Sequence, residues 1–347
     1  MTTAAVIIGL GAALPPRVVP NAELVSQLDV TEEWIERRTG IRARRAVEPG
    51  VLTSDLAVTA GRNAFKSANI EDVDAVIVAT TTPDRLSPAM APDVAYRLGI
   101  GRSIAAFDMA AVCTGFVYGL AASAGLIAGG IVGSVLLIGA ETNTYFLNRA
   151  PATRGSAVLF GDGAGAVVLR AGEPAELGAL EAFDLGSDGA GKDLITIGAG
   201  GAGQRAAAAV GGRAPAYASD ADLYWALSGQ EVYRRAIRHM SQSAAAVLAT
   251  AGCTADEVDR FVAHQANQRI LDATANRLGI PPERRLGNVA SVGNTGAASI
   301  PIALADACQD GHLVGGHRLL ITAFGGGLTW GSTILRWPDV EAVATAH

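Results

Sequence analysis

Residues 105–116 read Ala-Ala-Phe-Asp-Met-Ala-Ala-Val-Cys-Thr-Gly-Phe, and the order of features in this stretch decides the fold. A short apolar run, typical of a buried strand, ends just before Cys113, and an alanine-rich helical pattern follows at once. Strands that alternate with helices in this way build layered α/β folds. The alternation continues in both directions along the chain. It predicts strands at 5–9, 75–79, 105–108, 135–138, 166–169, 260–263, 319–322 and 332–335, and helices at 53–67, 92–98, 114–128, 229–251, 268–278 and 299–309.

Four landmarks of the first half of the chain return in the second half, in the same order. They are Val-Asp leading to Arg-Leu-Gly-Ile (73–100 and 258–280), Ala-Ala-Val-Cys113-Thr-Gly against Ser-Val-Gly-Asn294-Thr-Gly, Leu-Leu-Ile-Gly-Ala140 against Leu-Leu-Ile-Thr-Ala323, and Gly-Ala-Val-Val-Leu-Arg170 against Gly-Ser-Thr-Ile-Leu-Arg336. Four matches in register favour a duplicated α/β half over chance. We therefore predict two copies at 1–172 and 220–337, a Gly- and Ala-rich surface connection within 173–219, and a frayed tail at 338–347.

Composition excludes several broad classes of protein. Half of the 347 residues are apolar, 17% are charged and the net charge is −6, so neither general disorder nor nucleic-acid binding is expected. An odd count of three cysteines argues against a disulfide scaffold and for a reducing, cytoplasmic location. The N-terminal segment lacks a basic stretch, so we expect no secretory signal. The uncharged stretch 109–140 is interrupted by glycines, and we expect a buried helix and strand there rather than a membrane span.

Three side chains are candidates for chemistry. Cys113 stands at a helix start, where the helix dipole and backbone N–H groups favour the nucleophilic thiolate, although it could instead be a small buried apolar residue. His264 follows an apolar strand and is either a working group at the sheet edge or a hydrogen-bonded structural histidine. Asn294 precedes a helix and could simply cap it. The repeat places Cys113 and Asn294 at equivalent helix starts, so we expect both near a pseudo-twofold axis with His264 beside them.

The run Phe324-Gly-Gly-Gly327 follows a predicted strand. It could aim backbone N–H groups at an oxyanion, or it could be a plain turn between strands. The chain lacks a complete dinucleotide fingerprint, a phosphate-binding loop and a Cys/His spacing for zinc. We therefore expect no metal and no resident cofactor.

Together these motifs resemble the β-ketoacyl-(acyl carrier protein) synthase III family. The resemblance covers about 5–337 and rests on the following motifs: Ala-Ala-Val-Cys113-Thr-Gly-Phe, His264-Gln-Ala-Asn, Gly-Asn294-Thr-Gly-Ala-Ala-Ser, Phe324-Gly-Gly-Gly-Leu-Thr-Trp-Gly, Glu33-Trp-Ile-Glu-Arg-Arg-Thr-Gly-Ile-Arg42 and Phe160-Gly-Asp-Gly-Ala-Gly165. It implies a thiolase-like fold of five layers, α-β-α-β-α, with two pseudo-symmetric halves and a homodimer. It also implies an acyltransferase that primes fatty acid or polyketide synthesis, with acyl-CoA as substrate and malonyl-acyl carrier protein as second partner.

The same resemblance implies a role for each matching residue. Cys113 would accept the acyl group, His264 and Asn294 would polarise the malonyl thioester, and the N–H groups of Cys113 and Gly326 would hold the oxyanion. Contacts to the substrate are implied for Trp34, Arg38, Arg154, Gly229, Asn267 and Phe324, and docking of the carrier protein for Arg234 and Arg269. Segment 230–285 has eight arginines against six acidic residues, a weak excess that fits an acidic partner.

The chain departs from the family pattern at a few positions. Ser87 matches the place where many members carry a bulky aromatic that closes the acyl pocket across the dimer, which predicts a longer or branched acyl group. Val112 and Thr114 replace small neighbours of the nucleophile. Three other activities stay open: acyl transfer to a hydroxyl or amine of a natural product, hydrolysis by a Cys-His-Asn centre, and a non-catalytic binding subunit.

Overall fold

The computed structural model describes residues 3–101, 103–210 and 220–346, and two stacked sheets dominate it. The first sheet has the order β15-β1-β7-β6-β4-β5 and the second has the order β12-β11-β13-β14-β8. The strands of the first sheet are β1 (Ala4–Leu14), β4 (Ala75–Ala79), β5 (Ala105–Met109), β6 (Ser134–Thr142), β7 (Asp162–Gly172) and β15 (Val343–Ala346). Those of the second are β8 (Leu180–Ser187), β11 (Arg260–Ala263), β12 (Arg285–Leu286), β13 (Arg318–Gly325) and β14 (Thr329–Arg336).

The two sheets share one topology, apart from the added β15. In the first, β4 runs parallel to β5 and β6, β7 is antiparallel to β6, and β1 is antiparallel to β7. In the second, β11, β13, β14 and β8 repeat the order and directions of β4, β6, β7 and β1, with β12 in the place of β5. The helices repeat as well: α3 (Thr53–Ala68), α4 (Ala91–Leu98) and α5 (Gly115–Ala128) correspond to α8 (Gly229–Thr250), α9 (Gln268–Leu278) and α11 (Ser299–Gln309). The duplication predicted from the sequence is confirmed.

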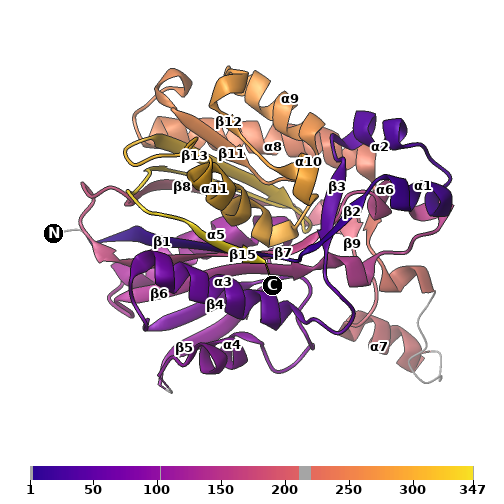
Figure 1. Ribbon diagram of the computed structural model, residues 1–347, viewed down its shortest axis with the longest axis horizontal. Coiled ribbons are helices and arrows are strands. Elements are labelled where there is room, and N and C mark those ends of the chain that lie inside the picture. The colour runs from indigo at the N-terminus through magenta and orange to yellow at the C-terminus, as the bar shows by residue number, and fades with distance from the viewer. Residues whose placement is uncertain (1–2, 102, 211–219, 347) are drawn as a thin grey trace.

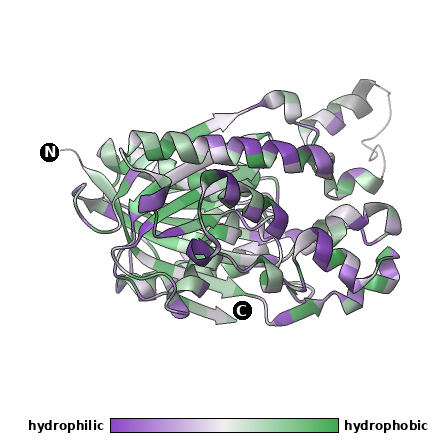
Figure 2. Ribbon diagram, turned by 90° about the horizontal axis from the view of Figure 1, so that it is seen from above, coloured by the Kyte–Doolittle hydropathy of each residue, from purple (hydrophilic) through white to green (hydrophobic). Residues whose placement is uncertain are grey.

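Five layers result, in the order α-β-α-β-α (Figure 1). Helices α5 and α11 lie between the sheets, where Phe116 and Leu120 of α5 join Ile300 and Leu304 of α11 in one buried cluster. Helices α3 and α4 cover the outer face of the first sheet, and α8 and α9 cover that of the second. Figure 2 shows hydrophobic residues gathered along the central strands and mixed colours along the helices that surround them. The predicted thiolase-like fold is confirmed.

Glycines allow some layers to approach closely. A Cβ on Gly11 of β1 would lie 2.2 Å from the backbone nitrogen of Ala64 in α3. A Cβ on Gly139 of β6 would lie 2.5 Å from the carbonyl oxygen of Ala297, just before α11. Only glycine fits at these contacts, because any side chain would meet backbone atoms that cannot move aside.

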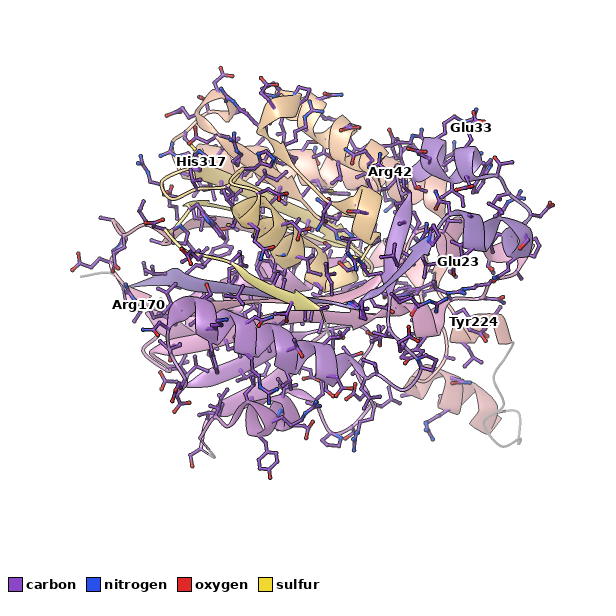
Figure 3. All side chains as sticks on the ribbon, in the orientation of Figure 1. Glu23, Glu33, Arg42, Arg170, Tyr224 and His317 are labelled. Atoms are coloured by element: carbon purple, nitrogen blue, oxygen red, sulfur yellow. The ribbon has the colours of Figure 1, made fainter. Side chains whose placement is uncertain are left out.

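The remaining elements lie mostly at one end of the layers (Figure 1). Strands β2 and β3 form an antiparallel hairpin, and β9 and β10 a second short pair. The elements are β2 (Arg17–Pro20), α1 (Ala22–Leu28), α2 (Glu32–Thr39), β3 (Ala43–Ala46), α6 (Arg154–Ala157), β9 (Ile195–Thr196), α7 (Ala202–Val210), β10 (Ala226–Leu227) and α10 (Val289–Val292). Figure 3 places Glu23 of α1 and Glu33 of α2 on the outside of this end.

The structure differs from the predictions in two segments of chain. The tail 338–347 was expected to fray, and for its described residues this expectation is wrong, because β15 pairs in parallel with β1 from Gly11–Val343 to Leu14–Ala346. Position 347 lies outside the described residues. The connection 173–219 contributes β8, which pairs with β14 in the second sheet, as well as α7. Positions 211–219 of that connection lie outside the described residues.

The uncharged stretch 109–140 contains the whole of α5 and most of β6, as expected of a buried helix and strand. No helix in the described part of the chain has the length and apolar character needed to cross a membrane.

Candidate active site

One cavity of about 480 Å³ reaches from the surface to the three candidate side chains. Cys113, His264 and Asn294 all line it, and each is more than nine-tenths buried. Arg38 and Arg269 line it as well and are exposed, so they mark its open end. The walls between these ends include Val158, Leu159, Phe160, Ile195, Leu227, Val232, Ala236, Met240, Ile270 and Phe324. The cavity is thus a mainly apolar channel with a polar inner end.

The duplicated architecture explains why these groups meet. Cys113 sits in a 3₁₀ turn, Val112–Thr114, that connects β5 to α5. In the second half, a 3₁₀ turn at Gly296–Ala298 precedes α11, and Asn294 comes just before it. His264 follows the end of β11. The two equivalent turns pack against each other at the seam between the halves, which brings sulfur and carboxamide to one cavity.

Strain is built into the turn that carries the sulfur. Val112 has φ of 49°, a left-handed conformation that is unfavourable for a β-branched residue. Neighbouring contacts hold this turn: the Thr114 hydroxyl donates to the Ala111 carbonyl at 2.6 Å and also contacts the Thr329 hydroxyl. A Cβ on Gly325 would lie 2.9 Å from the Cys113 nitrogen, so the end of β13 packs directly against the backbone of Cys113.

Two opposing effects set the resting state of the cysteine. Burial is the main reason why the pKa of the Cys113 thiol rises to about 12, and the nearby Glu141 carboxylate acts in the same direction. A backbone hydrogen bond from its own N–H acts in the opposite direction and is the smaller effect. The helix start favours the thiolate, as expected, but desolvation of the buried sulfur is the larger effect. A pKa this high leaves the sulfur as a neutral thiol at physiological pH.

Alkylation of Cys113 should follow this raised pKa. We expect its rate with iodoacetamide to climb about tenfold per pH unit between about pH 6 and pH 9, because the thiolate fraction grows by that factor below the pKa. Peptide mapping by mass spectrometry separates Cys113 from Cys253 and Cys308, which are also free thiols. A rate that levels off near neutral pH would show that the thiol is activated and would contradict this prediction.

His264 is neutral and oriented. Burial lowers the pKa of its imidazole to about 3, so the ring carries a single N–H at physiological pH. Its Nδ1 lies 2.7 Å from the hydroxyl oxygen of Ser299, the first residue of α11. Its backbone N–H donates to the Thr322 carbonyl at 2.9 Å, which continues the pairing of β11 with β13.

Asn294 is oriented by the turn that follows it. Its side-chain oxygen accepts the Gly296 N–H at 2.9 Å. Its backbone N–H donates to the Leu159 carbonyl at 2.9 Å, and its carbonyl accepts the Gly161 N–H at 2.9 Å. Since the amide oxygen is engaged by the backbone, the amide NH₂ group is the part of the side chain left to donate into the cavity.

Glu141, which the sequence reasoning missed, lies behind this pair. Its carboxylate accepts the Thr82 hydroxyl at 2.7 Å and the Thr81 N–H at 3.1 Å, and it packs against Gly296. Burial raises the pKa of Glu141 to about 7, against the opposing effect of these hydrogen bonds. The available signal in the sequence was a lone acidic residue at the end of a strand otherwise free of charge.

Replacing Glu141 by Gln should change how stability depends on pH. A raised pKa means that the folded wild type holds a proton that the unfolded chain releases, so stability contributed by Glu141 is greatest at low pH and is lost as pH rises towards 7. Gln has no such dependence. We expect the wild type to lose up to about 3 kcal/mol relative to E141Q between about pH 5 and pH 8.

Urea unfolding of both proteins across this pH range measures the difference. Asp162, whose pKa burial also raises, is present in both proteins and cancels in the comparison. Two stability curves that stay parallel would show that Glu141 does not titrate in this range.

The glycine-rich run forms the turn between β13 and β14. Phe324 lines the cavity, and its ring stacks on His239, which in turn stacks on Trp330 at a centroid distance of 4.0 Å. Gly326 does not line the cavity, although the backbone of its neighbour Gly325 abuts that of Cys113. The run is therefore a strand-to-strand turn that also supports the backbone of Cys113.

At the open end, two arginines flank one aromatic ring. The guanidinium of Arg38 lies 4.7 Å from the centre of the Trp34 ring, and that of Arg154 lies 5.7 Å from it. Gly229 and Asn267 also line the cavity. The Asn267 side chain is already engaged, because its NH₂ donates to the Arg38 carbonyl and its oxygen caps α9.

Two other predicted residues lie outside the cavity. One is Arg234, which is exposed on α8 and forms an ion pair with Glu231 at 2.6 Å. Its predicted companion Arg269 does line the cavity, at the rim, where its guanidinium lies over the Tyr233 ring. Ser87 is exposed on the loop between β4 and α4, away from the cavity of its own chain.

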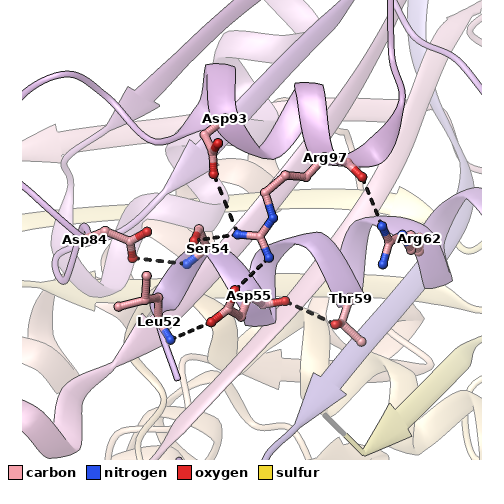
Figure 4. A network of polar contacts seen from close by, with 8 residues as sticks. All are labelled: Leu52, Ser54, Asp55, Thr59, Arg62, Asp84, Asp93 and Arg97. Atoms are coloured by element: carbon pink, nitrogen blue, oxygen red, sulfur yellow. Dashed lines mark hydrogen bonds and ion pairs between the residues drawn. The ribbon is translucent and has the colours of Figure 1, made fainter. Parts of the chain in front are cut away.

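The loop that carries Ser87 is anchored at both ends. At its start, Asp84 accepts the Ser54 N–H at 3.2 Å, within a network around Arg97 and Asp55 (Figure 4). At its end, the Asp108 carboxylate of β5 accepts the N–H groups that open α4.

Comparison with known proteins agrees with this site and fold. The chain matches the family model described as 3-oxoacyl-[acyl-carrier-protein (ACP)] synthase III over residues 107–189, and the model of that enzyme's C-terminal part over 248–337. It is 54% identical to β-ketoacyl-[acyl-carrier-protein] synthase III 3 of Streptomyces coelicolor, covering 99% of this chain and 100% of the relative.

Solved structures show the same likeness. The crystal structure of 3-oxoacyl-(acyl carrier protein) synthase III, FabH, from Pseudomonas aeruginosa PAO1 is 46% identical, with a TM-score of 0.87 over 97% of this chain and 99% of that one. The priming β-ketosynthase from the R1128 polyketide biosynthetic pathway is 31% identical, with a TM-score of 0.86 over 97% of each chain. The relatives share the five-layered fold, and the sequence motifs around Cys113, His264 and Asn294 agree with them. The chain therefore belongs to the β-ketoacyl-(acyl carrier protein) synthase III family of condensing transferases, within the thiolase superfamily.

Proposed function

We propose that the protein takes an acyl group from acyl-CoA onto Cys113 and then joins it to malonyl-acyl carrier protein with loss of CO₂, in the priming of fatty acid or polyketide synthesis. One observation carries this proposal: a nucleophilic thiol and two neutral N–H donors share the buried end of one channel. Membership of the family supports the choice of substrates.

The first half-reaction is a thioester exchange. The Cys113 sulfur attacks the acyl carbonyl, the carbon–sulfur bond to coenzyme A breaks, and the thiol proton passes to the departing sulfur of coenzyme A. The N–H of Cys113, which lines the cavity, would hold the oxygen while it carries negative charge. The family resemblance implies a second N–H from Gly326, which would have to turn towards the cavity when substrate binds. Because one thioester replaces another, the step needs no net base. This fits a thiol whose pKa burial has raised.

The second half-reaction uses the paired donors. The amide of Asn294 and the ring of His264 would donate hydrogen bonds to the malonyl thioester oxygen, so that the carbon–carbon bond to the carboxylate breaks, CO₂ leaves and an enolate remains. The enolate carbon then attacks the acyl carbonyl on Cys113, the carbon–sulfur bond breaks, and the released thiolate takes one proton from solvent. The product is a β-ketoacyl chain two carbons longer on the carrier protein.

Features at the rim support the choice of donor and acceptor. Trp34 between two guanidinium groups offers a flat, cationic site suited to the adenine and phosphates of coenzyme A. Exposed Arg234 and Arg269 would face an acidic carrier protein.

We also propose a homodimer formed through β5, with a cytoplasmic location. β5 is an edge strand of the first sheet and is only partly buried, and its Phe107 is exposed. The neighbouring Tyr96 and Leu86 are exposed by more than 70% each. An apolar edge of this kind invites pairing with a second copy. In such a dimer the loop with Ser87 would face the partner's channel.

Weighing the intact protein after incubation with a panel of acyl-CoA thioesters tests the proposal. We expect a mass gain equal to the acyl group with the wild type and none with C113S, followed by a β-ketoacyl product and CO₂ when malonyl-acyl carrier protein is added. Acyl transfer to a hydroxyl or amine would release no CO₂, and a hydrolase would release free acid without any acceptor. A C113A variant that still becomes acylated elsewhere would remove the basis of the proposal.

A further inference from the structure

The environment of His264 fixes more than the position of its ring. Besides its contact with His264 Nδ1 at 2.7 Å, the Ser299 hydroxyl oxygen accepts the backbone N–H of Gln265 at 3.2 Å. His264, Gln265 and Ser299 are each at least 98% buried. In such a site each hydrogen must have a definite acceptor.

Counting hydrogens decides which ring nitrogen carries the proton. The Ser299 oxygen already accepts a hydrogen from Gln265, and its own hydrogen needs an acceptor. Among the described residues, the acceptor within hydrogen-bonding distance of the Ser299 hydroxyl is His264 Nδ1. When the hydroxyl donates to Nδ1, that nitrogen must be bare. The single hydrogen of the neutral imidazole then sits on Nε2.

We propose that Ser299 is the positioning residue that holds His264 in the Nε2–H tautomer and so makes the ring a hydrogen-bond donor. In the other tautomer, Nε2 would present a lone pair and repel the thioester oxygen it is meant to stabilise. The chemical consequence rests on the proposed function, whereas the tautomer itself does not.

The same short segment orients the second donor. Gly296 N–H engages the Asn294 oxygen, and Ser299 engages His264 Nδ1, so the start of α11 sets both side chains. Each contact occupies the acceptor atom of the catalytic group and leaves its N–H for substrate. A structural role alone would require only that Ser299 fill space and cap the helix start.

Half-reactions with S299A and S299T separate these roles. We expect S299A to slow the condensation with malonyl-acyl carrier protein by about 10- to 100-fold, the usual effect of removing the partner that orients a histidine, while acylation of Cys113 by acyl-CoA changes little. S299T keeps the hydroxyl and should restore most of the condensation. Equal loss of both half-reactions in S299A, or no loss in either, would overturn the proposal.

Nitrogen NMR of the full protein labelled with ¹⁵N-histidine reads the tautomer directly and needs no substrate. The chain has five histidines, and the signals lost in H264A identify the ring in question. We expect a protonated Nε2 and a bare Nδ1 in the wild type, and a mixture of tautomers in S299A. A protonated Nδ1 in the wild type would overturn the inference even if condensation is observed. The expected tautomer without any condensing activity would instead count against the proposed function alone.

Discussion

Replacing Asn294 by Ala should lower the rate of condensation by about 10²- to 10³-fold, the cost of losing one preorganised donor to a developing oxyanion. Acylation of Cys113 should continue at close to the wild-type rate, because Asn294 acts on the malonyl thioester and not on the acyl donor. The amide is buried, and its oxygen is held by Gly296, so its NH₂ group donates without reorganising. Intact mass follows the first half-reaction, and release of CO₂ follows the second.

N294D is the matched control for this effect. Asp has the size of Asn and can still accept the Gly296 N–H, but it offers no N–H to substrate and adds a negative charge. It should therefore lose condensation at least as strongly as N294A while keeping the local backbone in place. If N294D retained condensation, the donor role of Asn294 would be refuted.

Replacing Gly139 by Ala should destabilise the protein by about 3 kcal/mol, the upper end for overpacking, because the new methyl meets backbone and not a movable side chain. The Cβ of an alanine at position 139 would lie 2.5 Å from the Ala297 carbonyl oxygen and 3.1 Å from the Ala298 Cα. The turn that follows Asn294 would have to shift. We therefore expect lower condensation activity together with the lower stability, measured by urea unfolding.

G125A provides the comparison for G139A. Gly125 lies in α5, and a Cβ there meets nothing within 4 Å. Ala at an open helical position should stabilise the protein by about 0.5–1 kcal/mol. If G139A were as stable as G125A, the close contact across the seam would be looser than the structure shows.

The periodicity of apolar residues predicted the strands and helices that are buried in the layered core. Strands such as β4 and β13 and helices such as α9 were placed within a few residues of their ends, because burial imposes the pattern. The edge strands β8 and β15 were not predicted. They are half-exposed, so their composition carries little signal, and their pairing depends on neighbours far away in the sequence.

Proximity in the site was more predictable than its electrostatics. The order of motifs in two copies was enough to expect Cys113, His264 and Asn294 at one place. The contacts of Ser299 and Glu141 could not be foreseen, since each joins segments that meet only after the sheets stack. The protonation of Cys113 could not be predicted for a related reason: a helix start is visible in sequence, whereas the depth of burial that outweighs it is not.

Residues 341–346 cover an edge of the first sheet on which another copy of the chain could otherwise pair. β15 covers the outer side of β1 between Gly11 and Leu14, and Thr345 and the Glu341 carbonyl bind side chains of α3. Trimming the chain at position 337 would bare N–H and C=O groups along a largely apolar strand, the kind of template on which further molecules stack and precipitate. Shortened versions of this protein should therefore be limited by solubility before they are limited by chemistry.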